Sequence, residues 1–207
     1  MGVMPMFPLG SALLPGAFLP LHVFEPRYRQ MIKDILADDV NPPEFGVTMI
    51  ERGFEVGGGD ERTEVGTVAR ILDIEVTDDG RYGVASVGAR RIRVNRWLPD
   101  DPYPLADVDD WPDDGAVPDD VGERISTLHD RVKELNESVR ALGELTPPAD
   151  SEISDEPELA VYHLGALAPL GPADRYRMLA CPGLAERLDV LAAALDDAAA
   201  VLEFRSS

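Results

Sequence analysis

Lysine and cysteine are scarce in this sequence, and each scarcity excludes a class of function. Lys33 and Lys133 are the only lysines among 207 residues. A phosphate-binding P-loop needs the pattern Gly-x-x-x-x-Gly-Lys-Ser/Thr, and neither lysine follows a glycine, so ATP hydrolysis of the P-loop type is excluded. The single cysteine, Cys181, cannot form a disulfide within the chain. Because disulfides belong to oxidising compartments, this predicts a cytoplasmic protein.

Recognisable groups of catalytic or metal-binding residues are also missing. His22, His129 and His163 are far apart in the sequence, and no HExxH motif or Cys/His pair accompanies them. A Ser–Lys dyad would need the two lysines, which we expect on solvated helix faces. Paired acidic residues such as Asp113 and Asp114 are numerous and lie in turn-like segments, so we expect them to be solvated turns and caps. We therefore predict no catalytic residue, no metal, no cofactor and no enzyme.

Long apolar runs are absent, and so is an excess of positive charge. No stretch approaches the roughly 18 apolar residues that span a bilayer, and residues 1–18 lack the basic region of a signal or transit peptide. The formal net charge is −20, and residues 98–123 hold ten acidic and no basic residues. This charge repels phosphate groups, so we predict neither a nucleic-acid nor a membrane partner. The arginines at positions 90, 91, 93 and 96 are expected to face water along a strand.

The segment 18–36 has the clearest structural pattern. Residues 18–24 are dense in large apolar side chains, which predicts a strand covered on both faces. Pro26 suits the first turn of a helix, and Glu25 places negative charge beside the free N–H groups there. Apolar residues then recur at the spacing of one helical face, namely Tyr28, Met31, Ile32, Ile35 and Leu36. We predict that this strand-to-helix corner is a structural keystone, formed by Pro20, Phe24, Glu25, Pro26 and Tyr28.

Further strands are predicted after this corner. Residues 45–50 are rich in β-branched side chains, and the glycine-rich residues 51–64 are predicted to form a loop. Two alternating strands follow in 65–95, joined by a tight turn at 78–80. Gly88 in the second of them suggests a bulge or a bend. Residues 103–108 offer one more short strand.

The last part of the chain has helical patterns. In the helix beginning near Val121, apolar residues alternate at spacings of four and three, and Asp119 or Asp120 is expected to cap it. Shorter helices are predicted from a cap at Asp155 to Leu167, over 172–180, and from Leu184 onward. Proline and glycine separate these helices, which favours one intramolecular bundle over a dimeric coiled coil. The predicted organisation is a β-rich subdomain (1–110), an acidic linker (111–120) and a helical bundle (121–207).

Four aromatic residues lie in segments whose pattern does not predict that their side chains are buried. Phe54 is in the glycine-rich loop, Trp97 follows the arginine-rich strand, Tyr103 precedes the last short strand and Trp111 is in the acidic linker. Aromatic side chains on loops beside a rigid sheet are suited to capturing extended apolar peptide. We therefore predict that these four bind peptide. The alternative is that they fill the joint between the two halves, which we favour for Trp97 and Trp111.

Several blocks of the sequence resemble the N-terminal (substrate-binding) domain of Lon protease. The block LPLHVFEPRYRQM at 19–31 is the most specific. The other similar blocks, in the same order as in that family, are residues 7–9, 14–16, 45–47, 65–71, 79–81, 87–94 and 174–191. The resemblance implies a β-rich, PUA-like pseudobarrel with one early helix, followed by an all-α helical bundle, in an α+β fold. It supplies no catalytic residue.

The resemblance also implies a function. It suggests a stand-alone Lon-domain protein without the ATPase and protease domains, which recognises unfolded or extended polypeptides and serves as an adaptor for proteolysis or a chaperone-like binder. Its partners would include a protease or a chaperone. An alternative is a small-molecule sensor or hydrolase that uses a pocket between the two subdomains, with His163 or Glu25. A nucleic-acid-binding role for a PUA-like fold would have to overcome the charge of −20.

Overall fold

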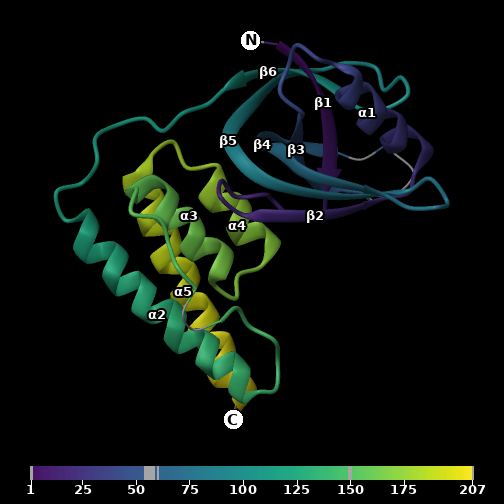
Figure 1. The fold of residues 1–207 in the computed structure, drawn as a ribbon. Helices are drawn as coiled ribbons and strands as arrows, with labels where there is room; N and C mark the ends of the chain where they lie inside the picture. Colours follow the sequence, from purple (N-terminus) through teal and green to yellow (C-terminus); the bar gives the residue numbers. More distant parts are fainter. Residues whose placement is uncertain (1, 54–58, 60, 149–150, 207) are drawn as a thin grey trace. The chain divides into compact units, whose positions relative to one another are not determined.

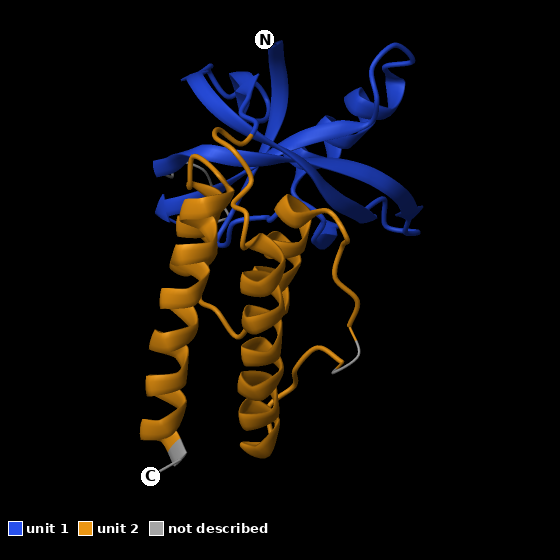
Figure 2. Ribbon diagram, turned by 90° about the vertical axis from the view of Figure 1, so that its left-hand side faces the viewer, with its two compact units in different colours: residues 1–112 blue, residues 113–207 orange. Residues whose placement is uncertain are grey.

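The protein has a mixed α+β fold, as predicted, and divides into two compact units. The computed structural model describes residues 2–53, 59, 61–148 and 151–206 (Figure 1). Unit 1 is Met1–Pro112 and unit 2 is Asp113–Ser207 (Figure 2). The boundary lies inside the segment 111–120 that the sequence marks as acidic. Within the described residues unit 1 contains six strands and one helix, and unit 2 contains four helices.

Unit 1 is organised by one curved sheet (Figure 1). Its strands and helix are β1 (Gly2–Leu9), β2 (Phe18–Val23), α1 (Pro26–Ala37), β3 (Glu44–Arg52), β4 (Glu61–Val76), β5 (Tyr82–Trp97) and β6 (Leu105–Asp110). The strand order is β2-β5-β4-β3-β1-β6, and β6 also pairs with β5. Five strands therefore form a closed ring, from β5 through β4, β3, β1 and β6 back to β5. β1 and β3 are parallel, whereas the other pairs are antiparallel.

The long hairpin of β4 and β5 confirms the predicted pair of strands and the predicted irregularity at Gly88. Val68 pairs with Arg90 and Ala69 pairs with Gly88, so one residue of β5 is left over as a bulge. A Cβ atom on Gly88 would lie 2.4 Å from the carbonyl oxygen of Leu14, which explains the need for glycine at this close approach. The predicted loop 51–64 is too long, because β3 continues through position 52 and β4 begins at position 61.

The prediction that residues 18–24 are covered on both faces is wrong. β2 pairs with β5 alone, and Phe18 and Phe24 are 63% and 52% exposed. The backbone N–H of Gly88 donates to the carbonyl of Ala17, at 2.9 Å. Hydrogen-bonded pairs alternate along an antiparallel ladder, so Pro20 lies at a position that faces the free edge. Proline is tolerated there because no ladder N–H is needed.

The helix predicted after Glu25 is present as α1. Pro26 is its first residue and Glu25 its N-cap, although the Glu25 side chain makes no capping hydrogen bond. The buried face holds Tyr28, Met31, Ile32 and Ile35, whereas Leu36 is 49% exposed. The Tyr28 ring stacks on Phe7 with 4.1 Å between the ring centroids. The helix therefore covers the core of unit 1 with one side.

Unit 2 contains α2 (Val121–Ala141), α3 (Pro157–Leu167), α4 (Pro172–Leu179) and α5 (Leu184–Ser206). The predicted apolar repeat of α2 is buried at Leu128, Val132, Leu135 and Val139, which pack with residues of α3 and α5 in one core, whereas Leu142 just after the helix is 37% exposed. Members of this core with no measurable exposure are Val161, Leu164, Met178, Leu188, Leu191 and Leu195. Asp120 is the N-cap residue of α2, as predicted, but its side chain makes no cap hydrogen bond. The predicted cap of α3 is wrong, because Pro157 occupies the first helical turn and Glu156, not Asp155, is the N-cap.

No helix of the described residues combines the length and the apolar character that crossing a membrane requires.

Candidate functional site

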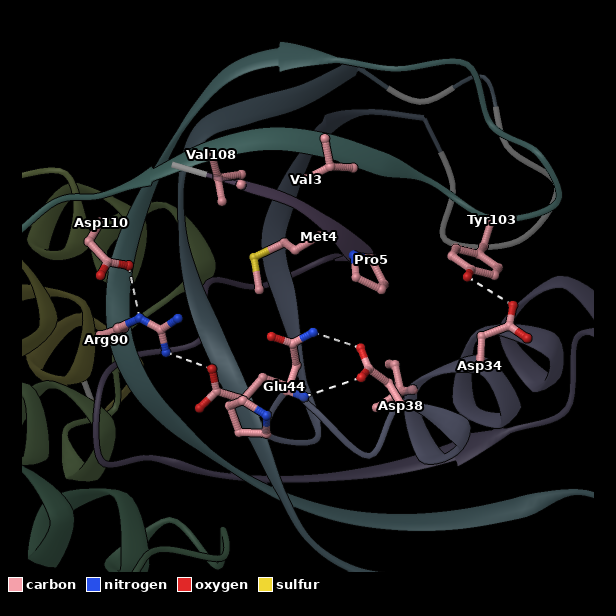
Figure 3. Close-up of a pocket in the computed structure, with 14 residues that line it drawn as sticks. Val3, Met4, Pro5, Asp34, Asp38, Glu44, Arg90, Tyr103, Val108 and Asp110 are labelled. Atoms are coloured by element: carbon pink, nitrogen blue, oxygen red, sulfur yellow. Dashed lines mark hydrogen bonds and ion pairs between the residues drawn. The ribbon is translucent and has the colours of Figure 1, made fainter.

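A cavity of about 550 Å³ opens on unit 1. It is lined by the beginning of β1, the C-terminal end of α1, the beginning of β3, and parts of β5 and β6 (Figure 3). Val3, Met4, Pro5 and Val108 give it an apolar side. Charged residues from α1, β3, β5 and β6 line the rest. Its volume lies within the usual range for ligand pockets, about 300–1,000 Å³.

Tyr103 lines this cavity and is held by a residue of α1. Its hydroxyl donates a hydrogen bond to Asp34 Oδ2 at 2.9 Å, and the amide of Gln30 donates to the other carboxylate oxygen at 2.7 Å. Burial, together with the Asp34 carboxylate, raises the pKa of Tyr103 to about 12. Tyr103 therefore stays a neutral hydrogen-bond donor near pH 7, and the Asp34 carboxylate is fixed in orientation by two neutral donors.

Asp38 supplies a second oriented carboxylate just after α1. Asn41 donates its side-chain amide at 2.7 Å, and the backbone N–H groups of Val40 and Asn41 donate at 3.0 and 3.2 Å. These hydrogen bonds, that of the Asn41 side chain first, lower the pKa of Asp38 below its ordinary value. Hydrogen bonds to the charged form have this effect because they favour ionisation. Asp38 is therefore an anion at neutral pH.

The opposite part of the cavity wall carries a charge network of two carboxylates and two guanidinium groups. Glu44, at the beginning of β3, is only 8% exposed. Its two carboxylate oxygens accept from Arg70 and Arg90, at 2.8 and 2.7 Å. Arg90 also donates to Asp110 at 2.8 Å (Figure 3). This network explains how a buried glutamate is tolerated, since its charge has two cationic partners.

The four aromatic residues predicted to bind peptide do not all meet at the cavity. Tyr103 alone of the described three lines it. Trp97 packs against the core around β5 and β6, and the Arg62 guanidinium lies 4.6 Å from its ring centroid. The ring of Trp111 has the guanidinium groups of Arg91 and Arg93 at 4.2 and 4.8 Å. Phe54 lies outside the described residues.

This contact of Trp111 changes the interpretation of the arginine-rich strand. We predicted that the arginines of positions 90–96 face water, but Arg91 is only 5% exposed. The side chains of Arg91 and Arg93 lie on the same face of β5 and both reach the indole ring, which a cation–π interaction favours. Arg90 pairs with carboxylates instead. The prediction is therefore wrong for Arg91. Its aromatic partner Trp111 comes from a later segment, so the local pattern of the arginine-rich strand did not reveal it.

The predicted keystone residues differ in burial. Tyr28 is 3% exposed, whereas Phe24 is 52% exposed. The Glu25 carboxylate accepts a hydrogen bond from Arg27 Nε at 3.2 Å. Pro26 begins α1, and Pro20 lies at the free edge of β2. Packing within this corner is thus concentrated on the tyrosine.

Sequence reasoning missed the most buried charged residue of unit 2. Arg187 in α5 has no exposed surface, and its guanidinium donates two hydrogen bonds to Asp113, at 2.6 and 2.7 Å. It also lies 4.0 Å from the ring centroid of Tyr162. Asp113 was predicted to be a solvated turn residue, and this is wrong because it pairs with the buried Arg187. The two residues are 74 positions apart in the sequence, so a local pattern could not reveal the pair. The acidic pattern alone gave no signal for it.

In the described part of the chain, neither His163 nor a group of possible metal ligands forms a second candidate functional site. His163 accepts a hydrogen bond at Nδ1 from the backbone N–H of Ser154, at 3.1 Å. This nitrogen is therefore occupied by a structural role rather than free to act as a base. Among the described residues no group of three or more His, Cys, Asp or Glu side chains is arranged to hold a metal ion.

Comparison with known proteins gives a consistent result. The family model described as the ATP-dependent protease La (LON) substrate-binding domain matches residues 3–197. A Lon protease of Anaeromyxobacter dehalogenans is 30% identical over 170 residues, which are 81% of this chain and 19% of that protease. This chain thus spans about a fifth of the length of the Lon proteases that it matches.

Two solved structures share the fold. One is a Lon N-terminal domain protein from Xanthomonas campestris, with a TM-score of 0.65 and 28% identity, covering 93% of this chain and 98% of that one. The other is the N-terminal domain of a Lon protease from the Mycobacterium avium complex. It has a TM-score of 0.64 and 18% identity, and covers 95% of this chain and 99% of that one.

Proposed function

The chain belongs to the family of ATP-dependent protease La (LON) substrate-binding domains, and from this premise we propose that it binds unfolded or extended polypeptides without catalysing a reaction. The observation that carries the proposal is the match of the family model to residues 3–197, nearly the whole chain. We further propose that the bound polypeptide is passed to a protease or a chaperone, so that the protein acts as an adaptor. Its single cysteine is in keeping with a place in the cytoplasm.

The cavity of unit 1 is the site that we propose for this binding. It combines an apolar side with oriented polar groups, which is the usual composition of a ligand pocket. Tyr103 presents a ring that can contact an apolar side chain, and its hydroxyl is already satisfied by Asp34. The ring would therefore contribute contact area without leaving a buried polar group unpaired.

We also propose a more detailed fold for each unit. The closed pairing of β5, β4, β3, β1 and β6 supports a PUA-like pseudobarrel for unit 1. The shared core of α2, α3, α4 and α5 supports a helical bundle for unit 2. Both assignments agree with the resemblance to Lon N-terminal domains.

Titration of a fluorescently labelled, permanently unfolded polypeptide with the full chain tests the proposed function. We expect saturable binding, and we expect Tyr103→Ala to weaken it about tenfold, because loss of a buried aromatic contact commonly costs more than 1 kcal/mol at an interface. Phe204→Ala is the matched control and should keep the affinity, since Phe204 is an exposed aromatic residue of α5 that does not line the cavity and was not predicted to bind peptide. Absence of binding by the unmodified chain would refute the proposal. Phe54→Ala examines the remaining predicted aromatic separately.

A further inference from the structure

Two of the carboxylates that line the cavity lack a cationic partner within the described residues. Asp34 accepts hydrogen bonds from Gln30 and Tyr103, and Asp38 accepts them from Asn41 and from backbone N–H groups. All of these donors are neutral. A carboxylate has about four acceptor positions, so both groups keep capacity for a further donor. This part of the wall therefore carries two exposed, oriented negative charges that pair with no cationic group of the described residues.

The position of these carboxylates on α1 strengthens their preference for a cation. They lie in and just after the last turn of the helix, where the backbone carbonyl groups already create a negative potential. Basic residues are favoured at such a helix end, yet the last turn of α1 contains none. Two negative charges at a negative helix end are locally unfavourable. A cation bound from outside the chain would remove this conflict.

The other lining residues indicate which kind of cation this cavity would bind. Arg90 pairs with both Glu44 and Asp110, so the one guanidinium group among the described lining residues is already held between two carboxylates. An anionic ligand would therefore meet no free positive charge among these described lining residues. The apolar side formed by Val3, Pro5 and their neighbours can accommodate an aliphatic chain. Lysine and arginine combine such a chain with a cationic end.

We propose that this cavity recognises a lysine or arginine side chain of the bound polypeptide, with the aliphatic part against Val3 and Pro5 and the charged end at Asp34 and Asp38. The inference rests on the proposed polypeptide-binding function and adds its specificity. The chain as a whole favours the same partner, because its net charge is −20 and attracts basic segments. Basic residues within apolar, unfolded segments would thus be selected over acidic ones.

Three labelled unfolded peptides that differ at one central position test this specificity by fluorescence anisotropy with the full chain. The position holds lysine, the uncharged isostere norleucine, or glutamate, and the flanking residues are apolar and uncharged. We expect the lysine peptide to bind about tenfold more tightly than the norleucine peptide, because its ammonium group can form a charge-assisted hydrogen bond with the carboxylates. We expect the glutamate peptide to bind more weakly than both.

Protein variants then locate the effect. In the double variant Asp34→Asn/Asp38→Asn the preference for lysine should disappear, whereas Asp73→Asn, an exposed residue of β4 outside the cavity, should keep it. A thermal melt of each variant verifies folding, and the peptide comparison itself needs no substitution in the protein.

The possible results separate this inference from the proposed function. Equal and measurable binding of the lysine and norleucine peptides would overturn the inference and leave polypeptide binding in place. Absence of binding by all three peptides would overturn both. Titration with Mg²⁺ alone is the remaining arm. A thermal stabilisation by Mg²⁺ that the double variant loses would assign the carboxylates to a metal ion and also overturn the inference.

Discussion

Arg187 is the residue on which the packing of unit 2 depends most clearly. It is a fully buried cation, and Asp113 neutralises it through two short hydrogen bonds. A buried charge is tolerated only when it is paired and hydrogen-bonded. The backbone N–H of Asp114 also donates to the carbonyl of Pro182 at 2.9 Å. The beginning of unit 2 is thereby fixed to the connection between α4 and α5.

Removal of the acidic partner should therefore destabilise unit 2. We expect Asp113→Ala to lower the free energy of unfolding by about 3 kcal/mol, because it leaves the Arg187 guanidinium buried without its counter-ion. Urea unfolding followed by circular dichroism at 222 nm measures this, since most helical residues belong to unit 2. Asp119→Ala, at an exposed position of the same acidic segment, is the control and should change stability by less than about 0.5 kcal/mol. Equal effects of the two substitutions would contradict this role of Asp113.

Tyr28 and Phe24 provide a matched pair within the predicted keystone. We expect Tyr28→Ala to cost about 3 kcal/mol or more, because its ring is buried and stacked on Phe7. Phe24→Ala should cost about 1 kcal/mol or less, since half of that side chain is exposed. Fluorescence of Trp97 and Trp111, both in unit 1, follows urea unfolding of this unit. A Tyr28→Ala protein with unchanged stability but lost polypeptide binding would contradict the structural role.

Helices and strands with a regular apolar spacing could be predicted from the sequence. Which other elements they pack against or pair with could not. The apolar spacing of α1 and α2 identified their buried faces, because a helix has to bury its apolar side. For β2 the apolar density suggested burial on both sides, yet the strand lies at the edge of the sheet. An edge strand pairs on one side and a central strand on both, and the local composition of a strand does not show which of the two it is. Pro20 was the signal for an edge that the interpretation overlooked.

The segment before α3 is tied to that helix by a bond that depends on pH. His163 accepts the Ser154 N–H at Nδ1, which requires this nitrogen to be unprotonated. Burial lowers the pKa of His163 below its ordinary value of 6.5. The unfolded chain therefore takes up the proton more readily, so the free energy of unfolding should fall as the pH drops below about 6.5 through the lower pKa of the folded state.

Urea midpoints measured at about pH 7.5 and about pH 5 test this dependence. We expect His163→Gln to reduce the difference between the two midpoints. His22→Gln, at an exposed position of β2, should leave that difference as in the unmodified chain. The same pH difference in the His163→Gln protein and the unmodified chain would contradict the role of the histidine.

The family and the α+β class of the protein could be predicted from the sequence, but its site could not. The block at 19–31 identifies the family through residues that form the strand-to-helix corner. The cavity, in contrast, is assembled from Val3, Asp34, Asp38, Tyr103 and Asp110, which meet only when β1 and β6 pair beside α1. Of these, Tyr103 alone was predicted as a binding residue. The pairing of strands distant in sequence is what local patterns could not supply.

We propose that this protein binds polypeptide in an unfolded state. This is tested by a pair of titrations of the full chain with one labelled polypeptide, in its native form and in a permanently unfolded form of the same sequence. We predict saturable binding of the unfolded form and no measurable binding of the native form. Equal affinity for the two forms, or no affinity for the unfolded one, would refute the proposed binding of unfolded polypeptide.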